Sequence, residues 1–392
     1  MIRIVIASSY GDRNLGDQAI AEAMISHLKE NIDCDIVFLS FDPLRSGRDL
    51  KVRAVRSTFF RGIGETFREM READVVIIGG GGLIQDQSSF FNLLFHLSRI
   101  YLARIARVKI MGYALGVGPL TMKLSRKIAT YLLDKIDLIT LRDEESLHLL
   151  QAMGVRKPVI RVTADPVINY PEINGGRQRV VKMFSILKKK KIIIGVNLRK
   201  IFHYRRFIPA FLTLRKDFLN SSRGLKELQN LLQAIAGVLN RICDQYGAAL
   251  VFFSMLDEID GNISKEMANY IDEKNIMKDV QSPDTVPEMF RLIDTFDLVI
   301  GMRLHALIMA FKMKKPIVAV SYSSKVDAFM NSIDAGAYVN DAYNFNQDVF
   351  FTQVSQVIAN RKKISAWNAQ EYIRKSELER TNIMMLKGLL GE

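Results

Sequence analysis

The stretch of residues 297–325 restricts the fold of this chain more than any other. Residues 298–300 are a short apolar run, which is typical of a buried parallel strand. Residues 306–313 are apolar and rich in helix formers, and Pro316 ends that helix before a second apolar run at 317–320. Two strands joined by a helix form a right-handed parallel crossover, so both strands end at the same edge of one sheet.

Cationic and titratable side chains follow both of these strands. Arg303 and His305 come after the first strand, and Lys325 comes after the second. Open α/β sheets bind ligands at this edge, and the free N–H groups of a helix N-terminus favour an anion. The pattern therefore predicts an anion-binding site that contains a histidine. The alternative is that Arg303 pairs with a nearby carboxylate and that His305 caps the helix.

Length and composition limit the class of protein. A chain of 392 residues can form two domains with separate cores. Cys34 and Cys243 have no Cys or His at ligand spacing, which argues against a disulfide scaffold or a zinc site and fits a reducing compartment. The N-terminus reads as a first strand rather than a signal peptide, and no uncharged apolar run is long enough to span a bilayer. We expect a cytoplasmic protein, peripheral at most on the inner face of the membrane.

The net charge of +13 fits nucleic acid, an anionic membrane surface or a phosphorylated ligand. The sequence has no zinc finger, no RNA-recognition signature and no continuous basic helix, so we expect no nucleic acid partner. Residues 90–107, strongly apolar with three arginines, and the lysine run 188–191 could contact anionic lipid. The alternatives are that the first segment covers a sheet as a buried helix, which we favour, and that the second is a solvated face.

Strands and helices alternate in two series. The first series has predicted strands at 2–7, 36–39, 51–58, 74–79, 108–111, 137–140 and 159–162. The second has predicted strands at 192–196, 249–253, 298–300 and 317–320. We expect one lobe at 1–170, a linker at 171–190, a second lobe at 191–345, and C-terminal helices at 346–392 with Trp367 near their junction. The sequence predicts an α/β fold of two Rossmann-like lobes that face each other across a cleft.

The first series also has candidate binding loops at strand ends. The loop after the first strand holds Asn14, Gly16 and Asp17, and its glycine lets the backbone approach a ligand; the alternative is that Asp17 merely caps the next helix. The fourth strand runs into four glycines, among them Gly80 and Gly81. Such a run allows close approach of a ligand or another domain, and its alternative is a loose turn.

Further polar side chains follow other strands. Arg142 comes after the strand at 137–140, with a salt bridge to Asp143 or Glu145 as its alternative. Asn197 and Arg199 end the strand at 192–196. We expect all of these residues at the carboxyl edges of the two sheets.

Six motifs follow one another between residue 1 and about residue 330. They are Asn14-Leu-Gly-Asp-Gln-Ala-Ile20, Gly79-Gly-Gly-Gly-Leu-Ile-Gln-Asp86, Gly116-Val-Gly-Pro119, Arg142-Asp-Glu-Glu-Ser146, Asp165-Pro166, and Gly301-Met-Arg-Leu-His305 with Lys325. Taken together and in this order, they resemble the polysaccharide pyruvyl transferase family. Leu115 departs from that family, since many members carry a polar residue there.

This resemblance implies a glycosyltransferase-B-like fold with the acceptor on the first lobe and the donor on the second. It implies transfer of a pyruvyl group from phosphoenolpyruvate to a sugar diol of a cell-surface polysaccharide or its precursor, with a cyclic pyruvate ketal and phosphate as products. The acceptor could be lipid-linked. In the family the Arg-Leu-His motif serves the donor, which implies that role for Arg303, Leu304 and His305.

The residue chemistry agrees with that reaction. Phosphoenolpyruvate carries a phosphate and a carboxylate, for which Arg303, Lys325 and Arg142 can supply the cations. His305 is the candidate acid that protonates the methylene carbon, because histidine titrates near neutrality, and Asp17 is the candidate base. We expect no metal and no cofactor beyond phosphoenolpyruvate as co-substrate. The remaining substrate-binding candidates are Asn14, Gly16, Gly80, Gly81, Asn197 and Arg199.

Two other functions stay open. A nucleotide-sugar-dependent glycosyltransferase of the same architecture would place Arg303 and Lys325 on a diphosphate. Its ribose would need an acidic residue, for which Asp257, Glu258 and Asp260 are candidates. A non-catalytic partner subunit of polysaccharide synthesis would keep the fold without the chemistry, although the cations and the candidate acid are all present.

Overall fold

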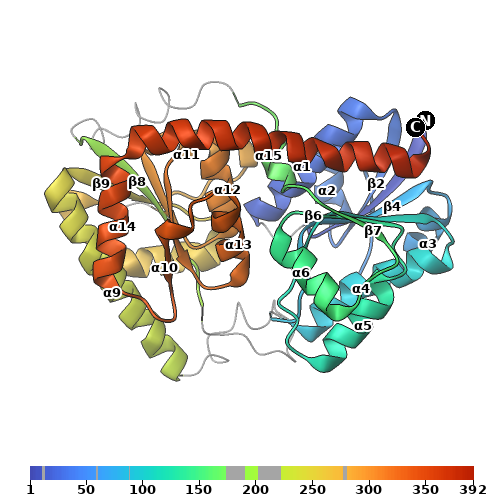
Figure 1. The fold of residues 1–392 in the computed structure, drawn as a ribbon, viewed down its shortest axis with the longest axis horizontal. Coiled ribbons are helices and arrows are strands. Elements are labelled where there is room, and N and C mark those ends of the chain that lie inside the picture. Colours follow the sequence, from blue (N-terminus) through green and yellow to red (C-terminus); the bar gives the residue numbers. More distant parts are fainter. Residues whose placement is uncertain (11–13, 59–60, 88, 174–189, 202–221, 277–279) are drawn as a thin grey trace. The chain divides into compact units, whose positions relative to one another are not determined.

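The computed structural model describes residues 1–10, 14–58, 61–87, 89–173, 190–201, 222–276 and 280–392 (Figure 1). The chain divides into two compact units. The described residues of Met1–Pro171 and Lys375–Glu392 form the first unit, and those between Glu172 and Arg374 form the second. Most of the predicted linker, with Lys188 and Lys189, lies outside the described residues.

The first unit is built on a seven-stranded parallel sheet with the order β3-β2-β1-β4-β5-β6-β7. The chain reverses its direction of growth between β1 and β4, which makes this the topological switch point of the sheet. The strands are β1 Ile2–Ala7, β2 Cys34–Ser40, β3 Arg53–Arg56, β4 Val75–Ile84, β5 Lys109–Val117, β6 Leu138–Leu141 and β7 Val159–Val162.

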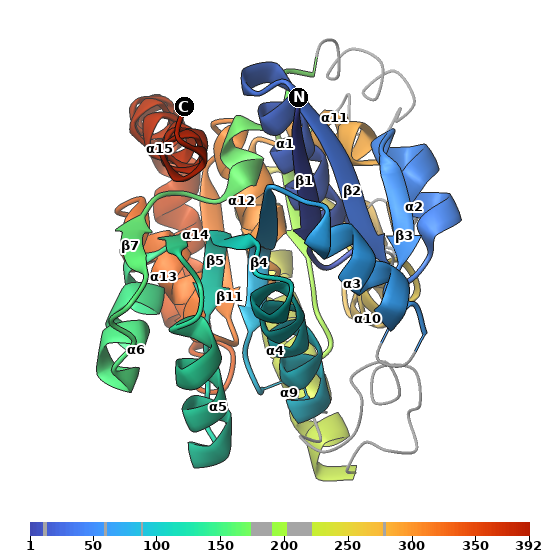
Figure 2. The same cartoon turned by 90° about the vertical axis from the view of Figure 1, so that its right-hand side faces the viewer.

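Helices cover both faces of this sheet, because its strands are apolar on both sides (Figures 1 and 2). One face packs against α3 Ile63–Arg71, α4 Phe90–Ile105, α5 Lys123–Leu133 and α6 Glu144–Met153. The other packs against α1 Leu15–Asn31, α2 Pro43–Leu50 and the last turns of α15 Arg361–Leu390. A short 3-10 helix, η1 Pro166–Asn169, follows β7.

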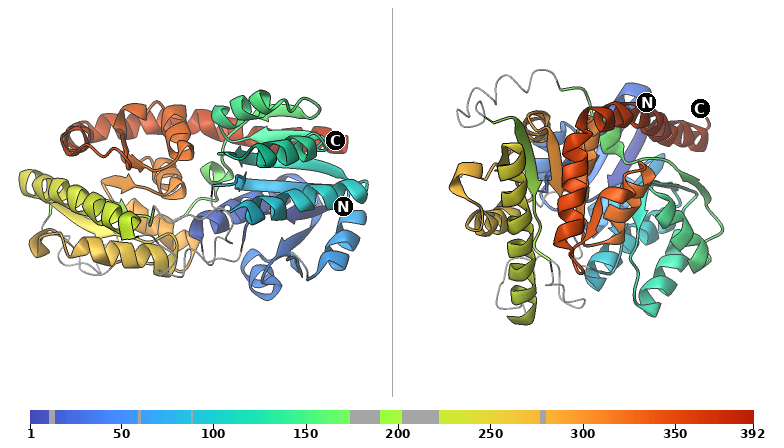
Figure 3. Two further views of the ribbon diagram at one scale, coloured as in Figure 1. Left: turned by 90° about the horizontal axis from the view of Figure 1, so that it is seen from below. Right: turned by 60° about the vertical axis from the view of Figure 1, so that its left-hand side comes forward.

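The second unit is built on a five-stranded parallel sheet with the order β12-β11-β10-β8-β9, and its switch point lies between β8 and β10. Its strands are β8 Ile192–Asn197, β9 Ala248–Phe252, β10 Leu298–Gly301, β11 Ile317–Ser321 and β12 Val339–Asp341. Its helices are α9 Ser222–Tyr246, α10 Asp257–Ala268, α11 Val286–Asp294, α12 Leu304–Lys312, α13 Ser324–Ser332 and α14 Gln347–Ala359, with η4 Glu273–Asn275 and η5 Gly336–Tyr338. Helices α9, α10 and α14 share one core with the sheet (Figure 3).

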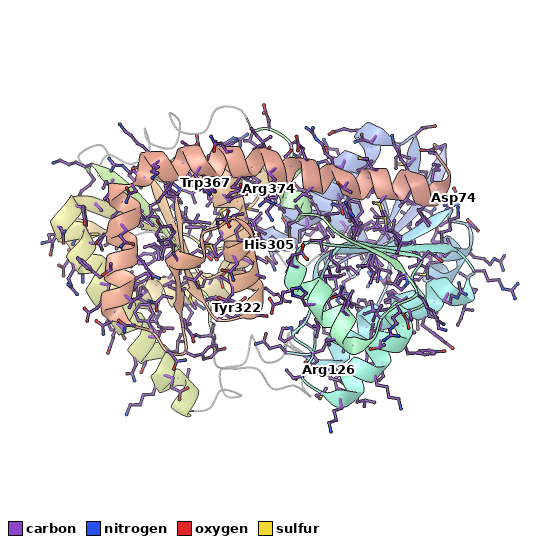
Figure 4. All side chains as sticks on the ribbon, viewed as in Figure 1. Asp74, Arg126, His305, Tyr322, Trp367 and Arg374 are labelled. Carbon is purple, nitrogen blue, oxygen red and sulfur yellow. The ribbon has the colours of Figure 1, made fainter. Side chains whose placement is uncertain are left out.

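The predicted α/β class with two Rossmann-like lobes is confirmed, and every predicted strand is present. Strands β4 and β5 run five and six residues past their predicted ends, and β12 was not predicted. The prediction for Trp367 was wrong. The junction between α14 and α15 falls at Asn360, and Trp367 lies within α15 (Figure 4). No helix in the described ranges combines the length and the apolar composition that crossing a bilayer requires.

The four glycines at 79–82 lie inside β4 rather than in a loose turn. Gly80 has a φ of +73°, and a Cβ added to it would lie 2.1 Å from Cγ2 of Ile20 on α1. A Cβ on Gly79 would lie 2.4 Å from the carbonyl oxygen of Tyr113 on β5. Close packing of α1 and β5 against β4 therefore requires glycine here. The substrate-binding role expected for Gly80 and Gly81 stays a prediction.

A buried polar network joins α15 to the first unit. His27 Nδ1 lies 3.1 Å from Glu379 Oε1, and its Nε2 lies 2.8 Å from the carbonyl oxygen of Asn169. Asn169 also donates to Glu379 Oε2 at 2.6 Å. A carboxylate and a carbonyl only accept hydrogen bonds, so both ring nitrogens of His27 must donate, which requires the imidazolium form.

The pKa of His27 follows from this network. Burial lowers it, but the hydrogen bond and the charge of Glu379 outweigh burial and raise it above its ordinary value of 6.5. The stability that protonated His27 contributes is therefore complete below pH 6.5 and is lost as the pH rises through the raised pKa.

We predict that Gly80→Ala destabilises the protein by about 3 kcal/mol, because it combines an unfavourable positive φ with a clash against Ile20. Gly154→Ala is the matched control, since Gly154 has a φ of +83° with nothing within 4 Å of an added Cβ. It should cost about 1 kcal/mol. Urea denaturation measures both, and equal losses would contradict the packing role of Gly80.

We predict that Glu379→Ala lowers the free energy of unfolding by roughly 3 kcal/mol, because it leaves the imidazolium of His27 buried without its counter-charge. The difference in the free energy of unfolding between this variant and the wild type should be largest below pH 6.5 and should become smaller above it. Glu377→Ala, at an exposed position of the same helix, is the control. A pH-independent difference would show that His27 is not the partner that matters.

Candidate functional site

The strand ends at the switch point of the second unit are tied together by Asn197. Its side chain is fully buried at the end of β8. Asn197 Oδ1 accepts from the backbone N–H of Arg303 at 3.2 Å, and Nδ2 donates to the carbonyl oxygen of Phe253 at 3.0 Å. The ends of β8, β9 and β10 are thus held in one network, and Asn197 fixes the position of the backbone from which Arg303 projects.

Arg303 forms a buried ion pair with Asp260. Its Nη2 donates to Asp260 Oδ1 at 2.6 Å, and its Nε donates to Oδ2 in the same pair. Asp260 is completely buried on α10, and only a tenth of the Arg303 side chain is exposed. The structure therefore contains the ion pair with a carboxylate that the sequence left open as the alternative for Arg303. The pair uses two guanidinium nitrogens and leaves Nη1 outside it.

Leu304 and His305 are the first two residues of α12, which begins two residues earlier than predicted. Arg303 is the N-cap, so the alternative that His305 is the cap residue was wrong. Lys325 is the second residue of α13, the same position that His305 holds in α12. Because β10 and β11 are neighbouring parallel strands, these equivalent positions lie at one edge of the sheet.

The N-termini of α12 and α13 are chemically similar. In both helices, as the described residues show them, the N-cap side chain makes no capping hydrogen bond. Helix α11 differs, since Thr285 and Glu288 form a complete capping box at its start. The N–H groups and dipoles of α12 and α13 therefore suit an anion at the carboxyl edge of β10 and β11.

Arg199 completes this edge from β8. Its guanidinium carbon lies 4.6 Å from the ring centroid of Tyr322, and its Nη1 donates to the Tyr322 hydroxyl. Its backbone N–H lies 3.4 Å from Sδ of Met302. Tyr322, which sequence reasoning missed, directly follows β11; its place between a strand end and Lys325 is the signal that could have identified it. Figure 4 labels Tyr322 and His305.

In the first unit, the loop after β1 forms a small polar cluster. Asn14, not Asp17, is the N-cap of α1, and its Oδ1 accepts from the N–H of Gly16 at 3.0 Å. Asp17 lies in the first turn, where its Oδ2 accepts from Asn14 Nδ2 at 3.0 Å and from Ser9 Oγ at 3.4 Å. The capping alternative for Asp17 was therefore wrong, because the amide of Asn14 already fills that role.

Arg142 is buried between two carboxylates. Its Nη1 lies 3.2 Å from Asp165 Oδ2, and its Nε lies 3.4 Å from Asp143 Oδ2. A Cβ on Gly116 would lie 2.8 Å from Nε, so the glycine makes room for the guanidinium. The salt-bridge alternative for Arg142 is thus present, with Asp165 as a second partner. Three of the motifs meet in this one cluster.

Asp86, at the end of the glycine motif, has a structural partner. Its carboxylate accepts from the backbone N–H groups of Thr121 and Met122 at 2.9 Å each. Burial raises the pKa of Asp86, but these N–H donors outweigh burial and lower it below its ordinary value. Asp86 therefore holds the chain that leads from the Gly116–Pro119 motif into α5.

The predicted site residues fall into two groups, one in each unit. The second unit brings six of them to the edge around β8, β10 and β11: Asn197, Arg199, Arg303, Leu304, His305 and Lys325. The first unit places five of them near the β1–β4 switch point and Arg142 at the end of β6. The side chains of Asp257 and Glu258 lie outside the described part of the structure.

Solved structures with the same architecture bind nucleotides and nucleotide sugars. MnaA of S. aureus, solved with UDP, is 13% identical, covers 95% of this chain over 91% of its own length, and has a TM-score of 0.61. HepE of Anabaena, in complex with UDP-glucose, is 12% identical, covers 99% of this chain over 100% of its own length, and has a TM-score of 0.61. The UDP-GlcNAc 2-epimerase of Neisseria meningitidis, bound to UDP-GlcNAc, is 11% identical over the full length of both chains with a TM-score of 0.60. These similarities confirm the predicted glycosyltransferase-B-like fold.

The sequence itself is similar to a more specific set of proteins. The family model described as polysaccharide pyruvyl transferase matches residues 14–324, which include all six motifs up to His305. The amylovoran biosynthesis protein AmsJ of Erwinia amylovora is 22% identical over 322 residues, covering 80% of this chain and 71% of AmsJ. With motifs, fold and family model in agreement, the chain belongs to the polysaccharide pyruvyl transferase family.

Proposed function

We propose that this protein transfers a pyruvyl group from phosphoenolpyruvate to a sugar diol of a cell-surface polysaccharide or its precursor. The products are a cyclic pyruvate ketal and phosphate. The observation that carries this proposal is the carboxyl edge of the sheet in the second unit. Among the described residues there, the N-termini of α12 and α13 have no side-chain cap, and Arg199, His305 and Lys325 lie at the same edge. Family membership supports the pyruvyl group as the one transferred.

The donor has two anionic groups that must be neutralised together. The N–H groups at the starts of α12 and α13 suit its phosphate, and Lys325 adds a charge at the second of these. Arg199 offers a guanidinium whose orientation is set by the ring of Tyr322. Arg303 is held by Asp260, so its contribution comes through Nη1 and through positioning the start of α12. No step of this scheme calls for a metal.

The reaction then proceeds by proton transfer and two additions. His305 donates a proton to the methylene carbon of phosphoenolpyruvate, the electrons of the double bond form the new C–H bond, and C2 becomes electrophilic. One sugar hydroxyl adds to C2 and loses its proton to a base, for which Asp17 is our candidate. The C2–O bond to phosphate breaks, and the second hydroxyl adds to C2 and gives up its proton. The methyl group gains one of the two hydroxyl protons and phosphate the other.

The alternative of a nucleotide-sugar-dependent glycosyltransferase draws on the same fold, because structural relatives are solved with UDP-glucose or UDP. A ribose in such a site needs an accessible carboxylate. Asp260, one of the residues proposed for that role, is fully buried and paired with Arg303. This pairing removes one of the three candidate carboxylates, and the side chains of the other two, Asp257 and Glu258, lie outside the described residues.

We predict acceptor-dependent release of phosphate from phosphoenolpyruvate, with a pyruvate ketal in the sugar product. His305→Ala should lower kcat by about a hundredfold or more, because it removes the general acid. His148→Ala is the matched control, since His148 is exposed on α6, and it should leave kcat unchanged. Normal turnover of His305→Ala would refute the assigned role. Binding of a nucleotide sugar without any use of phosphoenolpyruvate would refute the proposed reaction.

We predict that Arg199→Ala raises the KM for phosphoenolpyruvate by roughly tenfold or more, because it removes a charge-assisted contact to the donor. Arg241→Ala is the matched control: Arg241 lies 4.2 Å from the ring centroid of Phe351, an equivalent stack on helices α9 and α14. Steady-state kinetics at several donor concentrations measure both variants. Equal effects of the two changes would mean that Arg199 acts only through stability.

A further inference from the structure

The outward face of α4 is apolar although its inward face already fills the core. Leu93, Leu97, Ile100 and Ala103 pack against the sheet of the first unit. On the opposite side, Phe91, Tyr101 and Ile105 are between 45% and 54% exposed. These three residues fall on one side of a helix that advances about 100° per residue. The helix therefore covers the sheet, as favoured from the sequence, and also presents a second apolar stripe to solvent.

Helix α5 continues this surface. It packs beside α4 over the same face of the sheet (Figures 1 and 2). Its most exposed apolar residues are Leu124 and Tyr131, at 56% and 61%. Lys135 Nζ lies 4.7 Å from the ring centroid of Tyr131, so cation and aromatic ring stand together. We call the outward side chains of α4 and α5 the α4–α5 face.

The segment between Asp86 and Asp134 carries charge of one sign, and the Asp134 carboxylate accepts from the backbone N–H groups of Arg156 and Lys157. Residues 87–133 contain seven Lys and Arg residues and no Asp or Glu, whereas the average of the whole chain would give a stretch of this length about five acids. Arg104, Arg107, Lys123, Arg126 and Lys127 are exposed. The apolar stripe is thus bordered by cations without any carboxylate from the same segment to neutralise them.

A hollow beside Tyr131 adds a place for a phosphate. Its volume is about 440 Å³, and Arg126, Lys127 and Thr130 line it together with the apolar side chains of Leu149 and Met153. Arg126 Nε donates to the carbonyl oxygen of Leu120 at 2.7 Å, which orients the guanidinium (Figure 4). Two cations beside these apolar side chains match a lipid headgroup with its first acyl carbons.

We propose that the α4–α5 face docks on the surface of an anionic lipid bilayer. Aromatic and aliphatic side chains enter the interface between headgroups and acyl chains, and the surrounding cations contact lipid phosphates. A second copy of this chain is the less suitable occupant. A two-fold interface would bring the same cations of both copies together, and they would repel each other. This proposal does not depend on the reaction that the protein catalyses.

The test measures co-sedimentation of the full chain with lipid vesicles. We expect binding to vesicles of phosphatidylcholine mixed equally with phosphatidylglycerol, little binding to phosphatidylcholine alone, and a decrease with added salt. The double variant Lys123→Gln/Lys127→Gln should weaken binding by about 25-fold, because each cation near the lipid surface contributes about fivefold. Tyr101→Ser/Ile105→Ser should weaken it even at low salt, because it removes the inserted side chains.

Matched controls come from α15. Lys362→Gln/Lys363→Gln removes two exposed lysines there, and Ile373→Ser removes an apolar side chain that is 60% exposed. Neither should change vesicle binding, and urea midpoints check that every variant is folded. Absence of vesicle binding, or equal losses in the α15 controls, would overturn the proposal. So would sedimentation of a dimer that Tyr101→Ser/Ile105→Ser dissociates. Vesicle binding without use of phosphoenolpyruvate would overturn only the proposed reaction.

Discussion

The buried pair of Arg303 and Asp260 is the interaction on which the candidate site of the second unit depends. A guanidinium and a carboxylate can share a buried position only when their polar atoms are matched, because either charge alone would be strongly unfavourable there. The pair joins α10 to the N-cap of α12, and Asn197 joins the same backbone to β8 and β9. Leu304 and His305 therefore start a helix whose origin is rigid, and rigid placement is what stabilisation of developing charge requires.

The two switch points of this fold carry different chemistry. At the second unit's edge, His305 and Lys325 occupy equivalent positions of neighbouring strand–helix units, and Arg199 stacks on Tyr322 at the end of β11. At the first unit's edge, Arg142 is neutralised by carboxylates, and the described residues that follow β1 include the half-buried amide of Asn14 and carboxylate of Asp17. Cations suit an anionic donor and a carboxylate suits a hydroxyl, which is the division that the proposed reaction needs.

Two helices show that apolar composition and burial are separate properties here. The outward stripe of α4 is apolar and exposed at Phe91 and Tyr101. The inward stripe of α15 is largely polar, and Glu379 and Asn382 are buried where they meet His27 and Thr163. In α15 the polar residues have buried partners that satisfy them. In α4 the exposed apolar residues belong to a cationic surface, which the membrane proposal explains.

The sequence by itself determined the alternation of strands and helices, the two series, the parallel sheets and the edges at which the functional residues gather. These follow from hydrophobic period, from Gly and Pro positions and from the right-handed crossover, all of which act over short stretches of chain. Only the tertiary structure decided which side chains meet. Arg303 finds Asp260 from 43 positions away, Glu379 finds His27 from 352 away, and Gly80 is required by Ile20 on another element. No local pattern predicts such pairs, because each depends on how distant elements pack against one another.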